Sequence, residues 1–152
     1  MISLQSFFFQ IVLLTACANA DTITEGKQAD VKKVTVSGSD GNFTFSVTIS
    51  SPDTGCDQYA DWWEVVSESG ALLYRRILLH SHTNEQPFSR SGGPVKIAKN
   101  ETVWVRAHMN NSGYGGQAMK GSVAQGFAIA EIPEGLGDGL DTVAPLPSNC
   151  AF

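Results

Sequence analysis

The feature that most constrains the fold is a strict alternation of apolar and polar side chains between Asn42 and Ser50. Every second residue of this segment is large and apolar: Phe43, Phe45, Val47 and Ile49. Side chains of a β-strand point alternately to its two faces, so this period buries one face and leaves the other in water. The segment therefore predicts a β-strand with one face on a hydrophobic core.

Strand-like patterns recur between turn signals along the chain. The further predicted strands are 31–37, 62–67, 71–80, 95–98, 102–109 and 117–127. The strand 71–80 is apolar on both faces, which is typical of an internal strand. In 102–109, Val103, Val105, Ala107 and Met109 share one side, and Trp104, Arg106 and His108 share the other. Residues 84–93 are expected to be a long polar connection. We predict an all-β fold, an antiparallel two-sheet β-sandwich of about seven strands.

The order of these segments resembles that of immunoglobulin-like and fibronectin type III domains. A strand with Trp62 and Trp63 is followed by a turn, a further strand, and a Val-x-Val strand that runs into an Asn/Gly loop. The resemblance covers residues 31–127 and implies that the strand ending at His80 and the strand holding His108 lie in one sheet, separated by one strand. The cysteine pair of antibody domains is absent from the sequence.

The N-terminal residues predict export. Phe7–Ala18 is almost continuously apolar, too short to span a bilayer, and runs into the small-x-small sequence Ala18-Asn19-Ala20. This layout is typical of a cleaved signal peptide, here residues 1–20. The expected location is extracytoplasmic, either secreted or periplasmic.

A second interpretation of the same segment stays open. Leu14-Thr15-Ala16-Cys17 resembles the leader of bacterial lipoproteins. That resemblance implies a signal peptide of residues 1–16, a lipid on Cys17, and attachment to a membrane through that lipid.

Both interpretations leave Cys56 and Cys150 as the usable thiols, because Cys17 is either removed or acylated. An exported chain meets an oxidising environment, so we predict a Cys56–Cys150 disulfide. Residues 128–152 are acidic and rich in Gly and Pro, and lack an apolar pattern of their own. We expect this tail to be an extended strap tied back by the disulfide.

Charge and motifs restrict the function. The formal net charge is −5, and an acidic chain without a basic patch repels phosphate backbones, which excludes nucleic acid as the expected partner. No nucleophile elbow, phosphate loop or dinucleotide fingerprint occurs in the sequence. Catalysis is therefore not the leading hypothesis.

The three histidines form one candidate site. His80 and His82 are two apart, so on a strand they share a face, and the sheet order brings His108 toward them. Three imidazoles suit copper or zinc, with Met109, Glu85 or water completing the shell. The alternative is that they are polar residues at a strand end.

The aromatic residues form the other candidate site. Trp62 and Trp63 are adjacent, so one of them faces away from the core on a regular strand. With Tyr114 on a Gly-rich loop, an exposed Trp would stack on a sugar ring or a partner surface. The alternative is that a neighbouring strand or the tail covers it.

The two candidate sites lead to two functional hypotheses. The first is an exported binding or structural module with a protein or glycan ligand, and the second is a small extracytoplasmic copper- or zinc-binding protein.

Overall fold

The computed structural model describes residues 27–151, so the predicted signal peptide and Cys17 lie outside the described residues. Over this range the chain forms eight β-strands and one short 3₁₀ helix, η1 (Leu140–Thr142). The strands are β1 (Asp30–Ser39), β2 (Asn42–Ser50), β3 (Ala60–Ser67), β4 (Leu72–Ile77), β5 (Phe88–Val95), β6 (Val103–Met109), β7 (Ala118–Ser122) and β8 (Gly126–Ala130).

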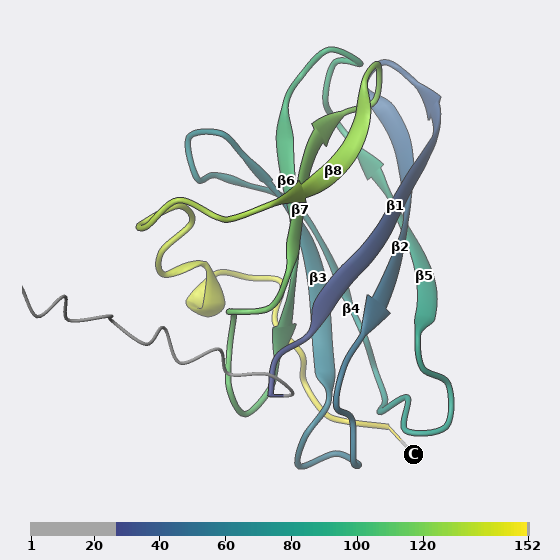
Figure 1. Cartoon of the computed structure of the whole chain (residues 1–152), viewed down its shortest axis with the longest axis vertical. Coiled ribbons are helices and arrows are strands. Elements are labelled where there is room, and N and C mark those ends of the chain that lie inside the picture. The colour runs from purple at the N-terminus through teal and green to yellow at the C-terminus, as the bar shows by residue number, and fades with distance from the viewer. Residues whose placement is uncertain (1–26, 152) are drawn as a thin grey trace, which may run out of the picture.

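Two antiparallel sheets pack face to face as a β-sandwich, as the sequence pattern predicts (Figure 1). One sheet has the order β1-β2-β5, and the other has the order β4-β3-β6-β7-β8. The strand before His80 and the strand holding His108 do lie in one sheet with β3 between them. The prediction of that sheet order is confirmed.

The main core lies between the sheets. It is built from the alternating residues of β2, namely Phe43, Phe45, Val47 and Ile49, together with the inner faces of β3 and β6. On β6 the inward set is Val103, Val105, Ala107 and Met109, as predicted. Period-two patterning therefore identifies the inward residues of β2 and β6.

A second, smaller apolar cluster lies on the outer face of the five-stranded sheet. Val66 of β3 and Trp104 of β6 pack there against Leu140 of the tail. The tail leaves β8, passes beside β3, and ends at the opposite end of the sheet (Figure 1). The tail is therefore a third layer over one face of the sandwich.

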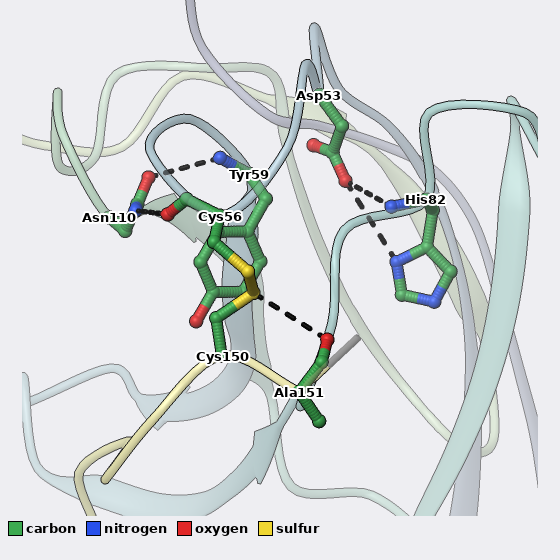
Figure 2. Close-up of a disulfide and its surroundings, with 7 residues drawn as sticks. All are labelled: Asp53, Cys56, Tyr59, His82, Asn110, Cys150 and Ala151. Carbon is green, nitrogen blue, oxygen red and sulfur yellow. Dashed lines mark hydrogen bonds and ion pairs between the residues drawn. A yellow bond between two sulfur atoms is a disulfide. The ribbon is translucent and has the colours of Figure 1, made fainter.

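The predicted Cys56–Cys150 disulfide is present and joins the end of this tail to the loop between β2 and β3 (Figure 2). Asn110, at the end of β6, holds the same loop, because its side chain donates to the Cys56 carbonyl at 2.8 Å. The strap is thus fixed at both ends, by β8 and by the disulfide.

Two predicted segments were wrong. Residues 88–95, which fall mostly in the expected polar connection, form β5, an edge strand whose inward residues Phe88 and Val95 are buried and whose outer face is polar. A Cβ at Gly92 would lie 2.5 Å from the Tyr74 hydroxyl, so a larger residue there would require the Tyr74 side chain to move. The expected single strand 117–127 is instead a hairpin of β7 and β8, which turns before Gly126 (φ 82°).

The strand β4 is an edge strand and not the internal strand expected. Its apolar residues are covered nonetheless, because Leu73 and Tyr74 pack on the main core while Leu72 packs on the outer cluster beneath the tail. Within the described range, no helix has the length and apolar character that crossing a bilayer requires.

Candidate ligand site beneath the C-terminal tail

The outer face of β3 carries an unusual set of buried side chains. Trp63 and Val65 point into the main core, so Trp62 and Glu64 point to the other face. Trp62 is only 3% exposed and Glu64 is 0% exposed. These two residues are buried because the tail and the Tyr114 loop cover this face.

Glu64 bridges two arginines from the flanking strands. The register places Glu64 opposite Arg75 of β4 and opposite Arg106 of β6. Arg75 Nε donates to Glu64 Oε2 at 2.8 Å, and Arg106 Nε donates to Oε1 at 2.8 Å. Both arginines are also buried. A buried ion pair is tolerated only when its remaining donors find acceptors. Here the tail supplies acceptors to both guanidinium groups.

Backbone carbonyls of the tail accept from the two guanidinium groups. Arg75 donates to the carbonyls of Leu140, Val143 and Pro145 at 2.5–3.0 Å. Arg106 donates to the carbonyls of Leu136 and Gly137 at 3.2 and 3.0 Å. The polar layer and the tail therefore depend on each other, because the arginines fix the path of the tail and the tail carbonyls accept from the arginines.

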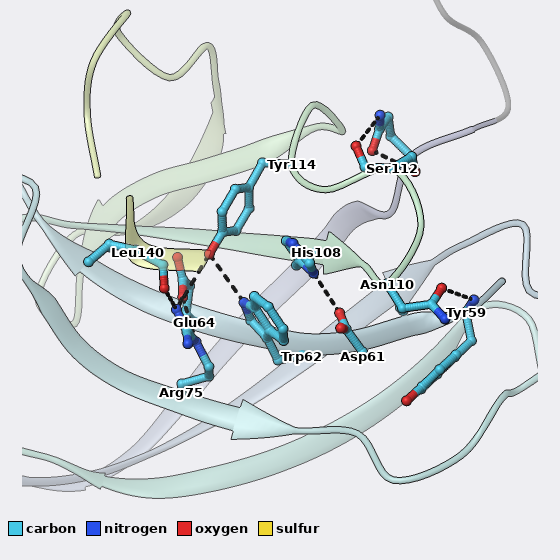
Figure 3. A network of polar contacts seen from close by, with 12 residues as sticks. Tyr59, Asp61, Trp62, Glu64, Arg75, His108, Asn110, Ser112, Tyr114 and Leu140 are labelled. Atoms are coloured by element: carbon cyan, nitrogen blue, oxygen red, sulfur yellow. Dashed lines mark hydrogen bonds and ion pairs between the residues drawn. The ribbon is translucent and has the colours of Figure 1, made fainter. Parts of the chain in front are cut away.

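Beside this triad, His108 pairs with Asp61. His108 Nδ1 lies 2.7 Å from Asp61 Oδ1, and the imidazole stacks on Trp62 with ring centroids 3.7 Å apart and a 7° interplanar angle (Figure 3). A carboxylate at Nδ1 favours the tautomer with the proton on that nitrogen, in which Nε2 is a hydrogen-bond acceptor. Among the hydrogen bonds of residues 27–151, none runs from a hydroxyl or thiol to this Nε2.

Tyr114 connects the two groups. Its hydroxyl accepts from Trp62 Nε1 at 3.3 Å (Figure 3). Its ring lies 3.7 Å from the Arg106 guanidinium. Burial, and then the negative charge of Glu64, raise the pKa of Tyr114 to about 12. The phenol is thus protonated at neutral pH and remains a hydrogen-bond donor as well as an acceptor.

Two cavities flank this aromatic group. The larger, which we call the tail cavity, has a volume of about 790 Å³ and lies between β7, β8, the Tyr114 loop and residues 131–141. The smaller, about 470 Å³, lies between the disulfide and the His108–Asp61 pair. The tail cavity has the volume of a small-molecule site. Its lining combines apolar Ile129, Ile132 and Leu136 with the polar side chains of Arg106, Tyr114, Glu131, Asp138 and Asp141.

The three-histidine metal site is not supported. His80 and His82 follow the end of β4 instead of lying on it, and their rings lie 4.5 Å apart. His108 is held elsewhere, by Asp61 and Trp62, and Met109 is buried in the main core. Over the described part of the chain, no three His, Cys, Asp or Glu side chains gather as ligands for copper or zinc. The strand β4 ends at Ile77, so His80 and His82 do not lie on the strand that was expected to place both rings on one face.

The aromatic prediction has a mixed outcome. Trp63 fills the main core, and Trp62 faces the other way but is covered, which was the stated alternative. Tyr114 does lie against Trp62 and lines the tail cavity, whereas Trp62 lines the smaller cavity. The assignment of these residues to ligand binding stays a prediction.

Sequence reasoning missed Asp61, Glu64, Arg75 and Arg106 as site residues. A signal was present, because each charged side chain interrupts a segment that is otherwise apolar on both faces. A charge at such a position is rarely buried without a partner. The identity of that partner depends on strand register.

Comparison with curated proteins finds a protein named "Putative lipoprotein" from Halomicrobium mukohataei, which is 41% identical to this chain over 112 residues. The match covers 71% of this chain and 55% of that protein, so the chain spans about half the length of the relative. No protein-family model matches the chain. No solved structure matches it either.

Proposed function

We propose that this protein is an exported module, anchored by a lipid on Cys17, whose β-sandwich binds a small carbohydrate in the tail cavity. The observation that carries the proposal is the composition of that cavity, in which an aromatic ring, an arginine and three carboxylates line about 790 Å³. Carboxylates accept hydrogen bonds from sugar hydroxyls, arginine donates to them, and an aromatic ring packs against the apolar C–H face.

The rigidity of the walls supports the binding role. Arg106 is held by Glu64 and by two tail carbonyls, and Tyr114 is held by Trp62. Groups whose positions are already fixed lose little conformational entropy when a ligand binds. Arg106 has five N–H donors, of which three are used within the protein, so two remain for a ligand.

Export and anchoring are supported by two independent observations. The segment Leu14-Thr15-Ala16-Cys17 resembles a lipoprotein leader, and the relative from Halomicrobium mukohataei carries the name "Putative lipoprotein". The ordinary signal-peptidase product, which would lack Cys17, is the alternative.

The proposed fold family is that of immunoglobulin-like and fibronectin type III domains. Strand order supports it, because β1, β2 and β5 form one sheet and β3, β4, β6 and β7 form the other. The additional strand β8 and the tail would then be elaborations that create the cavity.

Carbohydrate binding can be tested by saturation-transfer NMR with a panel of neutral mono- and disaccharides, followed by calorimetry for any sugar that responds. We expect saturable binding, weakened at least about tenfold by Asp138→Asn, since a loss near 1.4 kcal/mol is one such hydrogen bond to a charged group. The matched control is Asp57→Asn, an exposed carboxylate that does not line the cavity. Absence of binding across the panel, or equal binding by both variants, would refute the carbohydrate assignment.

Anchoring can be tested by intact-mass analysis of protein from a native or closely related host. The expected product begins at Cys17 and carries the mass of an acyl modification, and Cys17→Ser releases the protein from the membrane fraction. A product that begins at Asp21 would show that the protein is secreted without an anchor.

A further inference from the structure

Two arginines face each other at the open edge of the sandwich, far from the tail cavity in the fold. The strands β4 and β5 are edge strands of different sheets. Arg76 of β4 is paired with Trp63, and Arg90 of β5 is paired with Val47. Directly opposed residues share a face of the sheet, and Trp63 and Val47 are core residues, so both arginines lie on the inner faces.

A cavity of about 80 Å³ occupies this seam. Its lining residues are Arg76, Ile77, Leu78, Leu79, His80, His82 and Arg90. We call it the seam cavity. None of its lining residues carries a carboxylate. The seam cavity is therefore an electropositive space, in contrast to the acidic surface expected from the net charge of −5.

The nearby carboxylates are already engaged elsewhere. Glu85 forms an ion pair with Arg90 at 2.9 Å on the exposed side. Asp53 accepts from the backbone N–H groups of Ala60 and His82 and from the Ser51 hydroxyl. Arg76 has no carboxylate partner among residues 27–151. One guanidinium charge at the seam is thus left without a counter-charge.

Buried polar atoms without partners concentrate at the same place. Of the five such side-chain atoms in the described residues, four belong to the segment 76–82: Arg76 Nε, Ser81 Oγ, and both ring nitrogens of His82. Leaving a buried donor unsatisfied costs about 1–3 kcal/mol, so such a concentration is typical of a place that binds a polar ligand or ordered water.

His82 is held in a fixed orientation. It is 4% exposed and stacks on Phe88, with ring centroids 3.8 Å apart and an interplanar angle of 6°. Its Nδ1 lies 3.9 Å from Asp53 Oδ2, too far for a hydrogen bond (Figure 2). Asp53 does not line the seam cavity. Burial, Arg90 and His80 lower the pKa of His82, so the ring is neutral at pH 7 and carries one N–H.

We propose that the seam cavity binds a small oxyanion of the phosphate type, held by the guanidinium groups of Arg76 and Arg90 and by the His82 imidazole. Guanidinium groups match the oxygen spacing of such anions. The volume corresponds to between two and three water molecules of ~30 Å³ each, which restricts the occupant to a compact anion. Water alone would satisfy the orphaned atoms without balancing the charge of Arg76. This proposal is independent of carbohydrate binding.

The test uses the His82 ring as its reporter. Imidazole resonances are followed by NMR across pH, in inorganic phosphate and in chloride at matched ionic strength, because screening alone changes charge interactions. We expect a saturable shift and a raised His82 pKa in phosphate, since a bound anion stabilises the imidazolium. A response that is identical in chloride, or a non-saturable one, would overturn the proposal.

A pair of variants assigns the site. Arg76→Gln should weaken phosphate binding at least tenfold, whereas Lys96→Gln, an exposed cation outside the cavity, should leave it unchanged. Circular dichroism confirms that both variants are folded. If Arg76→Gln fails to fold, His82→Gln serves instead, with calorimetry as the readout. Wild-type phosphate affinity in the folded Arg76→Gln variant, or in the substitute, would refute the assignment.

The oxyanion could be free in solution or part of a lipid headgroup. Co-sedimentation with phosphatidylcholine vesicles, with and without phosphatidylglycerol, distinguishes these sources. Arg76-dependent binding to the anionic vesicles would assign a lipid phosphate, and its absence alongside phosphate binding would assign the free anion. If neither probe binds, the proposal fails.

Discussion

The two faces of β3 are equally buried but are held in different ways. On the inner face, Trp63 and Val65 pack among apolar side chains from both sheets. On the outer face, Glu64 lies between Arg75 and Arg106 beneath tail carbonyls. The inner layer is stabilised by removal of apolar surface from water. The outer layer gains little from charge burial itself and depends on hydrogen bonds between its charged groups and the tail.

The two layers should therefore lose stability in different ways when their residues are replaced. An apolar layer loses stability in proportion to the atoms removed, whereas a polar layer loses it when one partner is removed and the others are left unpaired. The outer layer also depends on a tail that is held by one disulfide. Loss of that disulfide should therefore destabilise the outer layer before the inner one.

Loss of the disulfide should have the largest effect. Cys56 and Cys150 are 94 residues apart, and closing a loop of that length stabilises by about 4.5 kcal/mol in the chain-entropy model. Urea denaturation of Cys150→Ser should show a decrease of that order in the free energy of unfolding. Hydrogen exchange should become faster at the amides of the tail before it does so at the amides of the core. Uniform quickening over the whole chain would mean that the layers are not separable.

Trp63→Ala tests the inner layer. Trp63 is fully buried and packs against Tyr74, so its truncation should cost about 4 kcal/mol through lost burial and a residual cavity. Urea midpoints give the value, and tail amides should keep their relative protection. A decrease in the free energy of unfolding below about 1 kcal/mol would contradict the packing described. In a well-packed core the neighbours of a truncated side chain cannot move enough to fill the space that it leaves.

Glu64→Gln tests the outer layer. The substitution keeps the side-chain shape but leaves two buried guanidinium groups without a counter-charge. We therefore expect urea denaturation to show a decrease of about 3 kcal/mol in the free energy of unfolding. The companion variant Glu64→Leu, Arg75→Met, Arg106→Met should recover part of this loss, because it leaves no buried charge unpaired. It does not recover all of it, because the tail carbonyls that accept from the arginines lose their donors. Equal losses in both variants would show that the layer behaves like the inner core.

Tyr114→Phe should have a smaller effect. It removes the hydroxyl that accepts from Trp62 Nε1 but retains the ring over Arg106. The expected loss is about 1 kcal/mol, the usual net contribution of one hydrogen bond. Thermal unfolding beside wild type provides the measurement, and an unchanged midpoint would place Tyr114 outside the network.

The pH dependence of His82 should be the smallest effect. Burial and Arg90 lower its pKa in the folded protein. Between the unfolded value near 6.5 and the lower folded value, the unfolded chain binds the extra proton, so stability falls as pH falls through that window. Urea denaturation at pH 7, 6 and 5 in phosphate-free buffer should show a steeper loss in wild type than in His82→Gln. Parallel curves would show that His82 titrates normally.

Much of the inner layer could be predicted from sequence, because its information is local. The alternation in Asn42–Ser50 and in Val103–Met109 assigns each side chain to a face without knowledge of the rest of the chain. The strand β5 escaped prediction because Ser89, Arg90 and Ser91 resemble a loop, and its edge position makes that polarity tolerable.

By itself, the sequence determined the sandwich architecture, the faces of its clearest strands and the partner of each usable cysteine. The period of apolar residues and the count of thiols are properties of the chain before it folds. The tertiary structure alone decided that Glu64 meets Arg75 and Arg106, 11 and 42 residues away, and that carbonyls of the tail complete them. Such contacts depend on strand register and on the path of the tail, and neighbouring residues encode neither.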